Sequence, residues 1–573
     1  MAHWPKLRSA AAVAVLGISM AVTAGSAAAA PGDLDSTFDG DGKLTFAPGG
    51  KQTEIDDVAI QPDGKLVLAG WIDQDGAGAD LDFLVARLNP DGSFDQSFGS
   101  GGTATMSFPA KGKTADTGSG VAIQPDGKIV VAGTSRDQSL GADRIAVGRF
   151  NANGTPDASF NAPGVPTDGG SPVPGEQLIS LDATVNDVVL DPSGRILVAG
   201  GWDGGAFFVG IDAYVLRLRS DGVPDSSFNG GSSAFHFGYG DSSDQPEAVS
   251  RIAVQPDGKI VLAGTAANST NQDAASARVS PGAVLDPDFN GGAFIYGRGD
   301  TNDAAQDLAL EPDGHILQAG EGFVSNTMML VRSSSRGPFE KWFNGSTVLS
   351  LDFGKPSIAN AIALQSNGKI VLGGTAGDDV AVARLQSNGA SDTSFGPDGK
   401  RTISFPGGDA DAFAMALQGD GKVVLAGRAG KSAAVVRVQG DSAAAGGGPG
   451  GPGAPNATGR APRMRKFTAK LKKGGRSVSF VLRSDQNSTG VVSGKTLRAY
   501  AAAKRHRVSL GSVRFKLTAN RSKTVVLRLS RKARKLLGSR HSLRVRFTVT
   551  LTNPAKQRGV SRRTLTLRTA RHK

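Results

Sequence analysis

Side chains that carry out chemistry are scattered along this chain without the spacing that chemistry needs. The chain has no cysteine, which excludes a thiol nucleophile and a disulfide framework. It has neither a His-Glu-x-x-His motif nor a Gly-x-Ser-x-Gly elbow. Its six histidines, none of them paired at metal-ligand spacing, are His3, His236, His315, His506, His541 and His572. The sequence therefore predicts no catalytic residue.

One loop is a candidate for cation binding. Asp73, Asp75 and Asp80 place carboxylates around glycines, as calcium loops do. Asp-Gly is also ordinary turn chemistry that recurs in nearly every repeat of this chain, and the complete twelve-residue calcium loop is absent. We expect no cofactor, with calcium at these three residues as the candidate exception.

The element that dominates the sequence is a repeated hairpin. Val58-Ala-Ile-Gln-Pro-Asp-Gly-Lys65, followed by Leu66-Val-Leu-Ala-Gly70, is the first of seven copies. Fixed-period similarity indicates a repeat architecture, because each unit buries its apolar faces against its neighbours. The turn glycines, spaced 53 to 67 residues apart, are Gly64, Gly127, Gly194, Gly258, Gly314, Gly368 and Gly421.

Two further motifs also occur seven times. One has Asp three residues before Phe, with Glu340 in the Asp position of the sixth copy, and ends at Phe38, Phe98, Phe160, Phe228, Phe289, Phe343 and Phe395. The other is an arginine in an apolar strand, at Arg87, Arg149, Arg217, Arg278, Arg332, Arg384 and Arg437.

Each repeat has the length and pattern of four strands. In the first repeat we expect them at 57–61, 65–71, 82–88 and 102–108, with Pro-Asp-Gly as the first hairpin turn. No window shows a helical period. Blades of four strands arranged radially protect their edges, so the sequence predicts an all-β protein with a seven-bladed β-propeller over residues 33–441.

These motifs resemble the delta-60 repeat family, over roughly residues 33–440. The matching runs are the Val58–Gly70 type of hairpin, Ala-Arg followed by Asp/Asn-Gly, and Leu-Asp-x-Ser-Phe. The resemblance implies a propeller-like fold in an exported bacterial protein and brings no established activity. Unit five departs most from the pattern, with His315 in place of Lys, so we expect any special surface there first.

The seven arginines have two interpretations. They could form a cationic ring that lines the axis of the propeller. Alternatively, each could pair with the Asp of its own repeat, such as Asp95 or Asp157, as a tie between blades. Sevenfold recurrence favours the tie, because a feature needed by every blade describes the scaffold and not a single asymmetric site.

The chain ends add three expectations. A strand at 43–47 should complete the last blade, because the seventh unit stops after its third strand. Residues 1–29 have the basic start, apolar stretch and small-residue site of a secretory signal peptide, which predicts a secreted or surface-associated protein without a transmembrane segment after cleavage. Residues 442–462 are a flexible Gly/Ala/Pro linker.

The C-terminal segment, residues 463–573, is strongly basic. It contains 32 Lys and Arg and one acid, Asp485, whereas the rest of the chain contains 32 Lys and Arg and 51 acids. Alternating apolar residues predict a small antiparallel β-sandwich, with a short helix at 530–537 capped by Ser530. The segment loosely resembles the Ig-like terminal modules of exported actinobacterial proteins.

This charge suggests attraction to a polyanion. The expected partners are anionic envelope or extracellular polymers, and few aromatics interleave the charge, so no nucleic-acid site is expected. The contact residues we expect are Arg531, Lys532, Arg534, Lys535, Arg562 and Arg563.

Three functions fit the sequence. The first is an exported non-enzymatic binding scaffold, tethered by its basic module, whose propeller ligand is unknown. The second is a propeller hydrolase or lyase that acts on an extracellular polymer, and the third is a structural or adhesive matrix component. Fold analogy does not choose among them.

Overall fold

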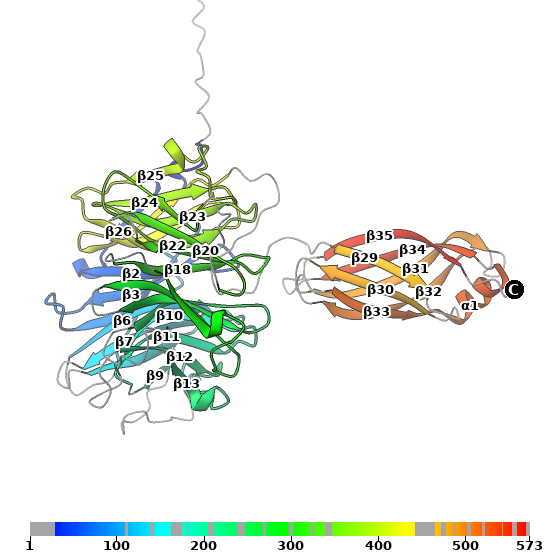
Figure 1. Cartoon of the computed structure of the whole chain (residues 1–573), viewed down its shortest axis with the longest axis horizontal. Helices are drawn as coiled ribbons and strands as arrows, with labels where there is room; N and C mark the ends of the chain where they lie inside the picture. Colours follow the sequence, from blue (N-terminus) through cyan, green and yellow to red (C-terminus); the bar gives the residue numbers. More distant parts are fainter. Residues whose placement is uncertain are drawn as a thin grey trace, which may run out of the picture.

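The described residues fold mainly as β-strands, as the sequence predicts (Figure 1). The structure is a computed structural model that describes residues 29–108, 113–137, 142–161, 175–179, 181–203, 211–235, 237, 247–267, 271–296, 302–322, 326–337, 346–441, 464–471, 477–484, 488–500, 506–517, 522–540, 542–552 and 558–568. The expected signal peptide and linker lie outside these residues, apart from Ala29.

The repeats form antiparallel sheets in sequence order. Among the described strands of the repeat region, five sheets have four strands and one has eight. The eight-stranded sheet consists of two consecutive four-stranded units that meet through one parallel pair, Leu81 and Ala115.

Each unit contributes strands to four positions, counted along the chain. The first strands are β2 (Thr53–Ile60), β6 (Thr114–Ile123), β10 (Ala183–Leu190), β14 (Glu247–Val254), β18 (Ala304–Leu310), β22 (Ser357–Leu364) and β26 (Ala410–Leu417). The second strands are β3 (Leu66–Asp73), β7 (Ile129–Asp137), β11 (Ile196–Asp203), β15 (Ile260–Ala267), β19 (Ile316–Glu321), β23 (Ile370–Ala376) and β27 (Val423–Ala429).

The third and fourth positions are filled in the same way. The third strands are β4 (Leu81–Leu88), β8 (Ala142–Phe150), β12 (Ile211–Leu218), β16 (Gln272–Val279), β20 (Met328–Ser333), β24 (Asp379–Leu385) and β28 (Ser432–Val438). The fourth strands are β5 (Thr103–Met106), β9 (Glu176–Ile179), β13 (Ser232–Phe235), β17 (Ala293–Tyr296), β21 (Val348–Leu351), β25 (Lys400–Ile403) and, from the chain start, β1 (Lys43–Phe46).

Each hairpin contains two glycines, and each is needed for a different physical reason. The turn glycines have φ between 83° and 101°, as at Gly64, which is the left-handed region that a tight turn demands. The second strand contains a glycine because a β-bulge in the first strand brings a carbonyl against that position. A Cβ added at Gly70 would stand 2.0 Å from the carbonyl oxygen of Glu54.

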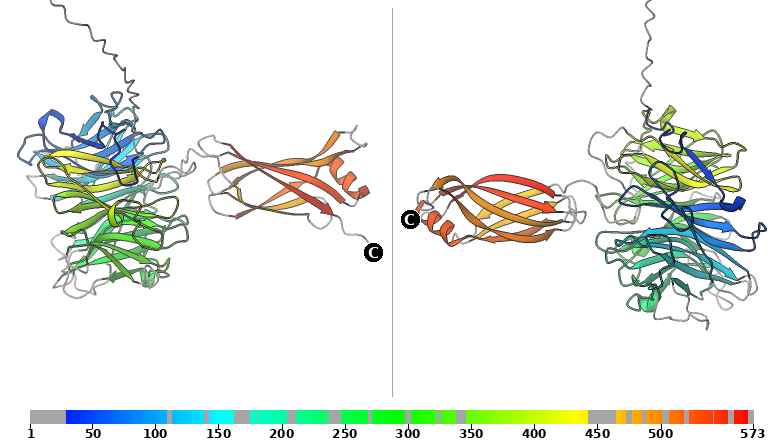
Figure 2. Two further views of the ribbon diagram at one scale, coloured as in Figure 1. Left: turned by 90° about the horizontal axis from the view of Figure 1, so that it is seen from above. Right: turned by 180° about the vertical axis from the view of Figure 1, so that it is seen from behind.

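Each first strand contacts the first strand of the next unit, in the order β2, β6, β10, β14, β18, β22 and β26. β26 in turn contacts β2, so the series is closed. β1 pairs antiparallel with β28, with Lys43 opposite Val436 and Phe46 opposite Ala433. The beginning of the repeat region therefore supplies the fourth strand of its last sheet, as the sequence predicts. Figure 2 shows the sheets of this region from two further sides.

The apolar cores lie between neighbouring sheets. One core joins Leu197 and Val215 of the third unit to Leu262 and Ala275 of the fourth. Another joins residues of the first unit to Val424 and others of the seventh. Burial between units explains why a single repeat has no stable core of its own.

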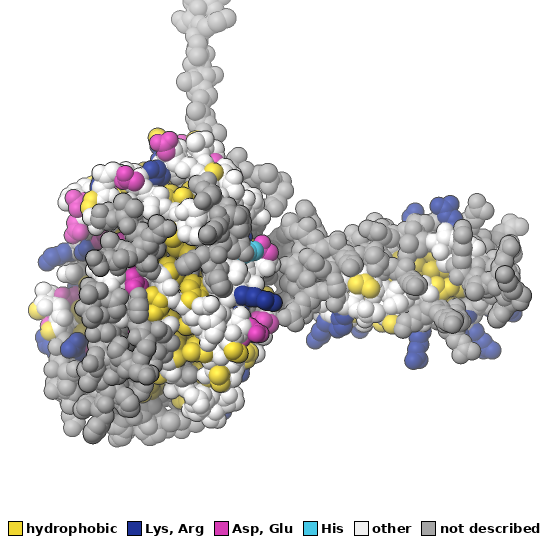
Figure 3. Space-filling view, viewed as in Figure 1, with side chains coloured by type: hydrophobic (Ala, Val, Ile, Leu, Met, Phe, Trp, Pro, Cys, Tyr) yellow, Lys and Arg dark blue, Asp and Glu magenta, His cyan; other side chains and the backbone are white. Residues whose placement is uncertain are grey.

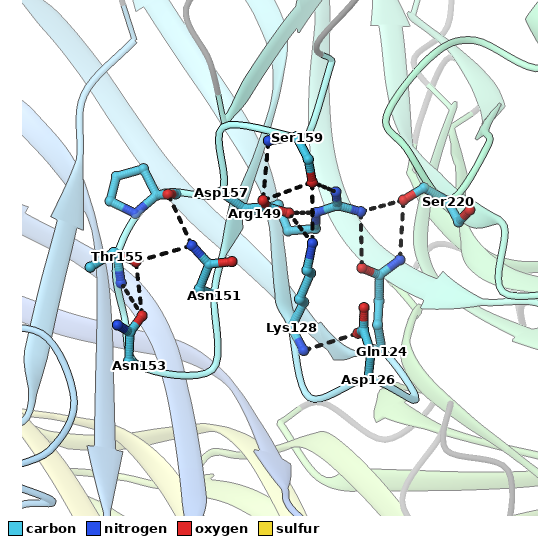
Figure 4. A network of polar contacts seen from close by, with 11 residues as sticks. Gln124, Asp126, Lys128, Arg149, Asn151, Asn153, Thr155, Asp157, Ser159 and Ser220 are labelled. Atoms are coloured by element: carbon cyan, nitrogen blue, oxygen red, sulfur yellow. Dashed lines mark hydrogen bonds and ion pairs between the residues drawn. The ribbon is translucent and has the colours of Figure 1, made fainter.

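A buried ion pair of the second unit is hydrogen-bonded to the third unit (Figure 4). Arg149 Nε donates to Asp157 Oδ2 at 2.7 Å, and Lys128 Nζ lies 2.7 Å from the same oxygen. Arg149 Nη1 donates to the carbonyl oxygen of Ser220, in the third unit. The guanidinium also lies 4.6 Å from the centre of the Phe160 ring. One arginine thus binds an Asp of its own unit and a backbone oxygen of the following unit.

The same arrangement recurs around the ring. Arg87 binds Asp95 at 2.7 Å and the carbonyl oxygen of Ala152, in the second unit. Arg437, in the seventh unit, binds Asp35 at 2.6 Å and the carbonyl oxygen of Pro90, in the first unit. The last unit is therefore tied to the first by side chains as well as by β1.

These contacts affect the acidity of the carboxylates. Burial, the largest single influence, would raise the pKa of Asp157. Hydrogen bonds from Lys128, Ser159 and the backbone, with the charge of Arg149, outweigh burial and lower this pKa to about 2. Asp35 reaches about 2 in the same way, with Lys422 and Arg437 as its cations. The folded protein thus favours the ionised carboxylates.

The second unit also contains two acids for which the described residues provide no ion pair. Asp116 is buried on β6, and Glu176 is partly buried on β9. Within the described residues, Asp116 Oδ1 and Glu176 Oε2 have no hydrogen-bond partner. Burial raises the pKa of Asp116 to about 6, and burial together with the charge of Asp116 raises that of Glu176 to about 7.

The C-terminal segment forms two further sheets (Figure 1). One contains β29 (Met464–Leu471), β30 (Ser477–Ser484) and β33 (Ser522–Arg528). The other contains β32 (His506–Leu517), β31 (Ser488–Tyr500), β34 (Ser542–Thr552) and β35 (Arg558–Arg568). Phe480 of the first sheet and Phe547 of the second lie in one core, with ring centres 5.0 Å apart.

The expected helix is present as α1 (Arg531–Arg540). Ser530 caps it, since Ser530 Oγ accepts a hydrogen bond from the backbone N–H of Ala533 at 3.2 Å. Ala533, Leu536 and Leu537 face the core. Among the described residues, no helix is long and apolar enough to cross a membrane.

Replacing Arg149 by Ala should lower the free energy of unfolding by about 3–5 kcal/mol, because the buried Asp157 loses one of its two cations and the carbonyl oxygen of Ser220 loses a donor. Arg219→Ala is the matched control, since its ion pair with Asp221 is exposed and should contribute less than about 1 kcal/mol. Chemical denaturation measures both values. Equal, small losses would contradict a tying role for Arg149.

Replacing Glu176 by Gln should stabilise the protein at pH 8 by about 1–2 kcal/mol. The folded pKa of Glu176 lies above its unfolded value, so ionisation favours unfolding, and the cost grows as pH rises from about 4.5 through 7. Thermal melts at pH 8 and pH 5 should therefore differ in the effect of this variant. An exposed carboxylate, in Asp126→Asn, is the control, and a gain for Glu176→Gln that does not change with pH would refute the explanation.

Candidate functional site

Three aspartates occupy the same position on alternate first strands. Asp57, Asp187 and Asp307 lie on β2, β10 and β18, each directly before the apolar run of its repeat. Each carboxylate accepts the backbone N–H of the next residue in its own strand. Its other oxygen accepts an N–H from the following unit, at 2.7–2.8 Å, from Val121, Ile252 and Ile362 respectively. These carboxylates therefore link first strands in pairs.

Arg251 stands at this same position on β14 and lies among the three carboxylates. Its Nη1 is 3.3 Å from Asp187 Oδ1 and 4.0 Å from Asp57 Oδ1, and its Nε is 3.2 Å from Asp307 Oδ1. We call Asp57, Asp187, Arg251 and Asp307 the axial cluster. One guanidinium thus connects strands of four different units.

The axial cluster carries more negative than positive charge. Burial, opposed by Arg251, raises the pKa of Asp307 to about 6, and the pKa of Asp187 is raised for the same reason. Burial alone would lower the pKa of Arg251, but the three aspartates raise it. The arginine stays charged, and its oxygen partners are already shared with backbone N–H groups, so the cluster serves mainly to hold the strands together.

A second polar group lies where β2 and β26 begin. Arg428 Nη2 is 2.6 Å from Asp411 Oδ2, and Arg428 Nε is 3.6 Å from Glu54 Oε2. Trp71 stands opposite Glu54 in the pairing of β2 with β3, and it lowers the pKa of Glu54. We call Glu54, Trp71, Asp411 and Arg428 the rim cluster. All four side chains are partly exposed, in contrast to most of the axial cluster.

The rim cluster has the chemistry of a polar binding site. Burial raises the pKa of Glu54, which Arg428 and Trp71 lower and Asp411 raises. The neighbouring Asp56 has its pKa raised well above the ordinary value by burial and by the charges of Glu54 and Asp57. Carboxylates, a guanidinium and an indole at one surface can hydrogen-bond a polyhydroxyl or cationic ligand, and a carboxyl of raised pKa can donate a proton.

The candidate calcium residues share one loop between β3 and β4. Asp73 is buried and accepts backbone N–H groups from Asp75, Gly76 and Gly78 at 2.9–3.1 Å. Asp75 forms an ion pair with Lys113. These contacts organise the loop, and calcium binding at Asp73, Asp75 and Asp80 stays a prediction.

The motif arginines lie on the third strands, as their pairing with the Asp motif requires, and not on the first strands around the axis. The expected polyanion contacts Arg531, Lys532, Arg534 and Lys535 are exposed on α1. Arg562 and Arg563 lie on β35 opposite Thr548 and Phe547, with side chains outside the described residues. These two basic groups therefore lie on different elements of the C-terminal unit.

Sequence reasoning missed both the axial cluster and the rim cluster. One indication was available: the residue before the apolar run is Asp in units one, three and five and Arg in unit four. A charge at a position that begins a buried strand needs a partner, and the only available partners stand at the same position of other units. The rim cluster has no such repeated pattern.

Comparison with known families agrees with this architecture. The model of a domain of unknown function (DUF5122), described as a β-propeller, matches residues 61–98, 124–160, 192–228, 255–289 and 365–395. A model of the WD domain, G-beta repeat, matches residues 175–208. No curated protein matches the chain.

Similar solved structures are distant. One is the extracellular domain of a protein described as a hybrid two-component system of B. thetaiotaomicron, at 10% identity and a TM-score of 0.33, covering 94% of this chain and 59% of that chain. Another is the periplasmic gluconolactonase of Pseudomonas aeruginosa, at 13% identity and a TM-score of 0.23, covering 65% and 96%. These values carry no argument about activity. The family matches and the antiparallel four-stranded units together identify the chain as a β-propeller repeat protein.

Proposed function

We propose that this protein is an exported, non-enzymatic binding protein. A seven-bladed propeller is its recognition platform, and the basic C-terminal unit tethers it to anionic polymers of the cell envelope or matrix. The signal-peptide pattern of residues 1–29 supports export. The closed series of first strands supports seven blades, and the single core between two sheets supports a C-terminal β-sandwich of the Ig-like kind.

One observation carries the tethering proposal: the C-terminal unit presents many cations that no acid neutralises. Ten Lys and Arg side chains in the described part of this unit are exposed and form no ion pair with a described residue. Figure 3 shows several Lys and Arg side chains projecting from the surface of this unit. Residues 463–573 contain a single acid. The ten are Arg514, Lys516, Lys523, Arg528, Arg531, Lys532, Arg534, Lys535, Arg544 and Arg546.

The described aromatic side chains of the same unit are poorly placed to stack on nucleic-acid bases. Phe480 and Phe547 are fully buried, and Phe515 is 9% exposed. Their rings build the core and cannot stack on bases at the surface. The exposed cations therefore favour a ligand recognised by its charge, such as an anionic wall polymer or an acidic polysaccharide.

The rim cluster is the part of the propeller that we propose for recognition. Its carboxylates, guanidinium and indole differ from the repeated scaffold residues, which are buried in ties between units. Binding through hydrogen bonds at a rigid rim needs no movement of the blades.

A hydrolase or lyase that acts on an extracellular polymer is the second candidate. The specific observation in its favour is the raised pKa of Glu54 beside Asp411 and Arg428, because a carboxyl of raised pKa can act as a general acid. A structural or adhesive matrix role is the third, and it predicts multivalent binding that does not saturate.

The tether predicts salt-sensitive binding to purified cell wall. Retention of the full chain should fall steeply between about 0.05 and 0.5 M salt, because exposed charges are screened over a few ångströms at high salt. Replacing Arg531, Lys532, Arg534 and Lys535 by Ala should weaken retention several-fold at low salt. Co-sedimentation across a salt series measures both effects.

The matched control keeps the charge and changes the shape. Arg531→Lys with Arg534→Lys should bind as the wild type does if the contact is electrostatic. Retention that is indifferent to salt, or unchanged in the fourfold Ala variant, would remove the tethering proposal. Binding that fails to saturate would favour the matrix role instead.

The enzymatic alternative has its own test. If the rim cluster cleaves a polymer, Glu54→Gln should reduce release of reducing ends or unsaturated products by about 10²-fold or more, since a general acid contributes that much to the rate. Asp63→Asn, in an exposed turn, is the control. Absence of cleavage across a panel of wall and matrix polysaccharides would leave binding as the function.

A further inference from the structure

The turn of unit five differs chemically from the other turns. In unit one the turn contributes Lys65, whose Nζ lies 2.6 Å from Asp95, the partner of Arg87. Units two, four, six and seven have a lysine that makes the equivalent ion pair, with Lys128, Lys259, Lys369 and Lys422. In unit five this position is His315, and Glu311 stands where unit one has Gln61.

The two substitutions bring three metal-ligating side chains together. The ligand atoms of Glu311, Asp313 and His315 all lie within 4.8 Å of one another. His315 Nδ1 is 2.8 Å from Asp313 Oδ1. The side chains of Glu311, Asp313 and His315 are 13%, 61% and 22% exposed. The group therefore opens to solvent on the side of Asp313, where an ion could enter.

The charge of this turn also differs from that of its counterparts. In unit one, Lys65 and Arg87 face Asp63 and Asp95, so the described charges balance. In unit five, Arg332 binds Glu311 and lies 3.8 Å from Asp313, and the turn 311–315 itself contains no lysine.

The consequence is one more negative than positive charge among the described side chains Glu311, Asp313 and Arg332 at this turn. Arg332 alone cannot neutralise Glu311 and Asp313 together, whereas every lysine-bearing unit supplies a second cation. A bound cation would restore the balance that the lysine provides in the other units.

We propose that Glu311, Asp313 and His315 form a binding site for one divalent transition-metal ion of the Zn²⁺ type. An imidazole with two carboxylates is a ligand set that suits zinc, whereas calcium and magnesium prefer oxygen ligands alone. The three residues alternate along one hairpin turn, at positions i, i+2 and i+4, so a single rigid element presents them. Three protein ligands leave a coordination position for water or for a donor of a second molecule.

The restoring substitution His315→Lys tests the site. It installs the residue that five other units carry, so folding should be preserved while a metal ligand is replaced by a competing cation. Isothermal titration of Zn²⁺ into the untagged full chain should show one site, with affinity lowered at least about tenfold in His315→Lys. Equimolar Mg²⁺ or Ca²⁺ should not displace the zinc.

Asp257→Asn, in the lysine-bearing turn of unit four, is the matched control and should bind zinc as the wild type does. If His315→Lys fails to fold, as judged by its thermal melt, Asp313→Asn provides the same test with a smaller change. Absence of zinc binding by the wild type at millimolar concentration would overturn the proposal. Equal zinc affinity of the wild type and the ligand variants would overturn it as well.

Discussion

The architecture depends on a buried charge that most units cannot satisfy alone. A guanidinium removed from water must be paired and hydrogen-bonded, or it costs several kcal/mol. Arg149 finds its carboxylate, Asp157, within its own repeat, but another of its N–H groups reaches Ser220 of the next unit. The hydrogen bonds of such an arginine are complete only when another unit follows in the chain. The last unit has such a partner only if it contacts the first unit, so the series of units must close.

The chain ends meet this requirement in a specific way. Arg437 obtains its carboxylate from Asp35, at the start of the repeat region, and its carbonyl from Pro90. At the opposite boundary, Arg384 binds Asp441, the last described residue before the linker, at 2.8 Å. Arg384 also pairs with Asp392 of its own unit. The seventh unit has no turn after its third strand, and Asp441, just beyond that strand, supplies the contact to Arg384 instead.

Sequence reasoning works here wherever a feature recurs. The hairpins, the turn glycines and the Arg–Asp pairs are local, so each copy reinforces the others. A strand is harder to predict where its pattern is broken: in β31 glycines interrupt the apolar alternation because aromatic rings pack on them, and a Cβ at Gly494 would lie 2.7 Å from the Phe547 ring. Sequence reasoning missed the axial cluster for another reason. Asp57 and Arg251 meet only because the ring closes, and ring closure leaves no local pattern in the sequence.

The charges of the two parts of the chain favour an external partner for the basic unit over the propeller itself. The acids outside residues 463–573 outnumber the cations, 51 to 32, which at first suggests that the two parts attract each other. Many of these acids are already engaged: Asp95, Asp157 and Asp35 are each bound by two cations and are nearly inaccessible. A carboxylate that is paired in this way contributes little to the electrostatic potential at the surface. At physiological ionic strength salt screens the remaining potential beyond about 8 Å. We therefore propose that the exposed cations of the C-terminal unit bind a flexible polyanion, which can follow their spacing, in preference to the rigid surface of the propeller.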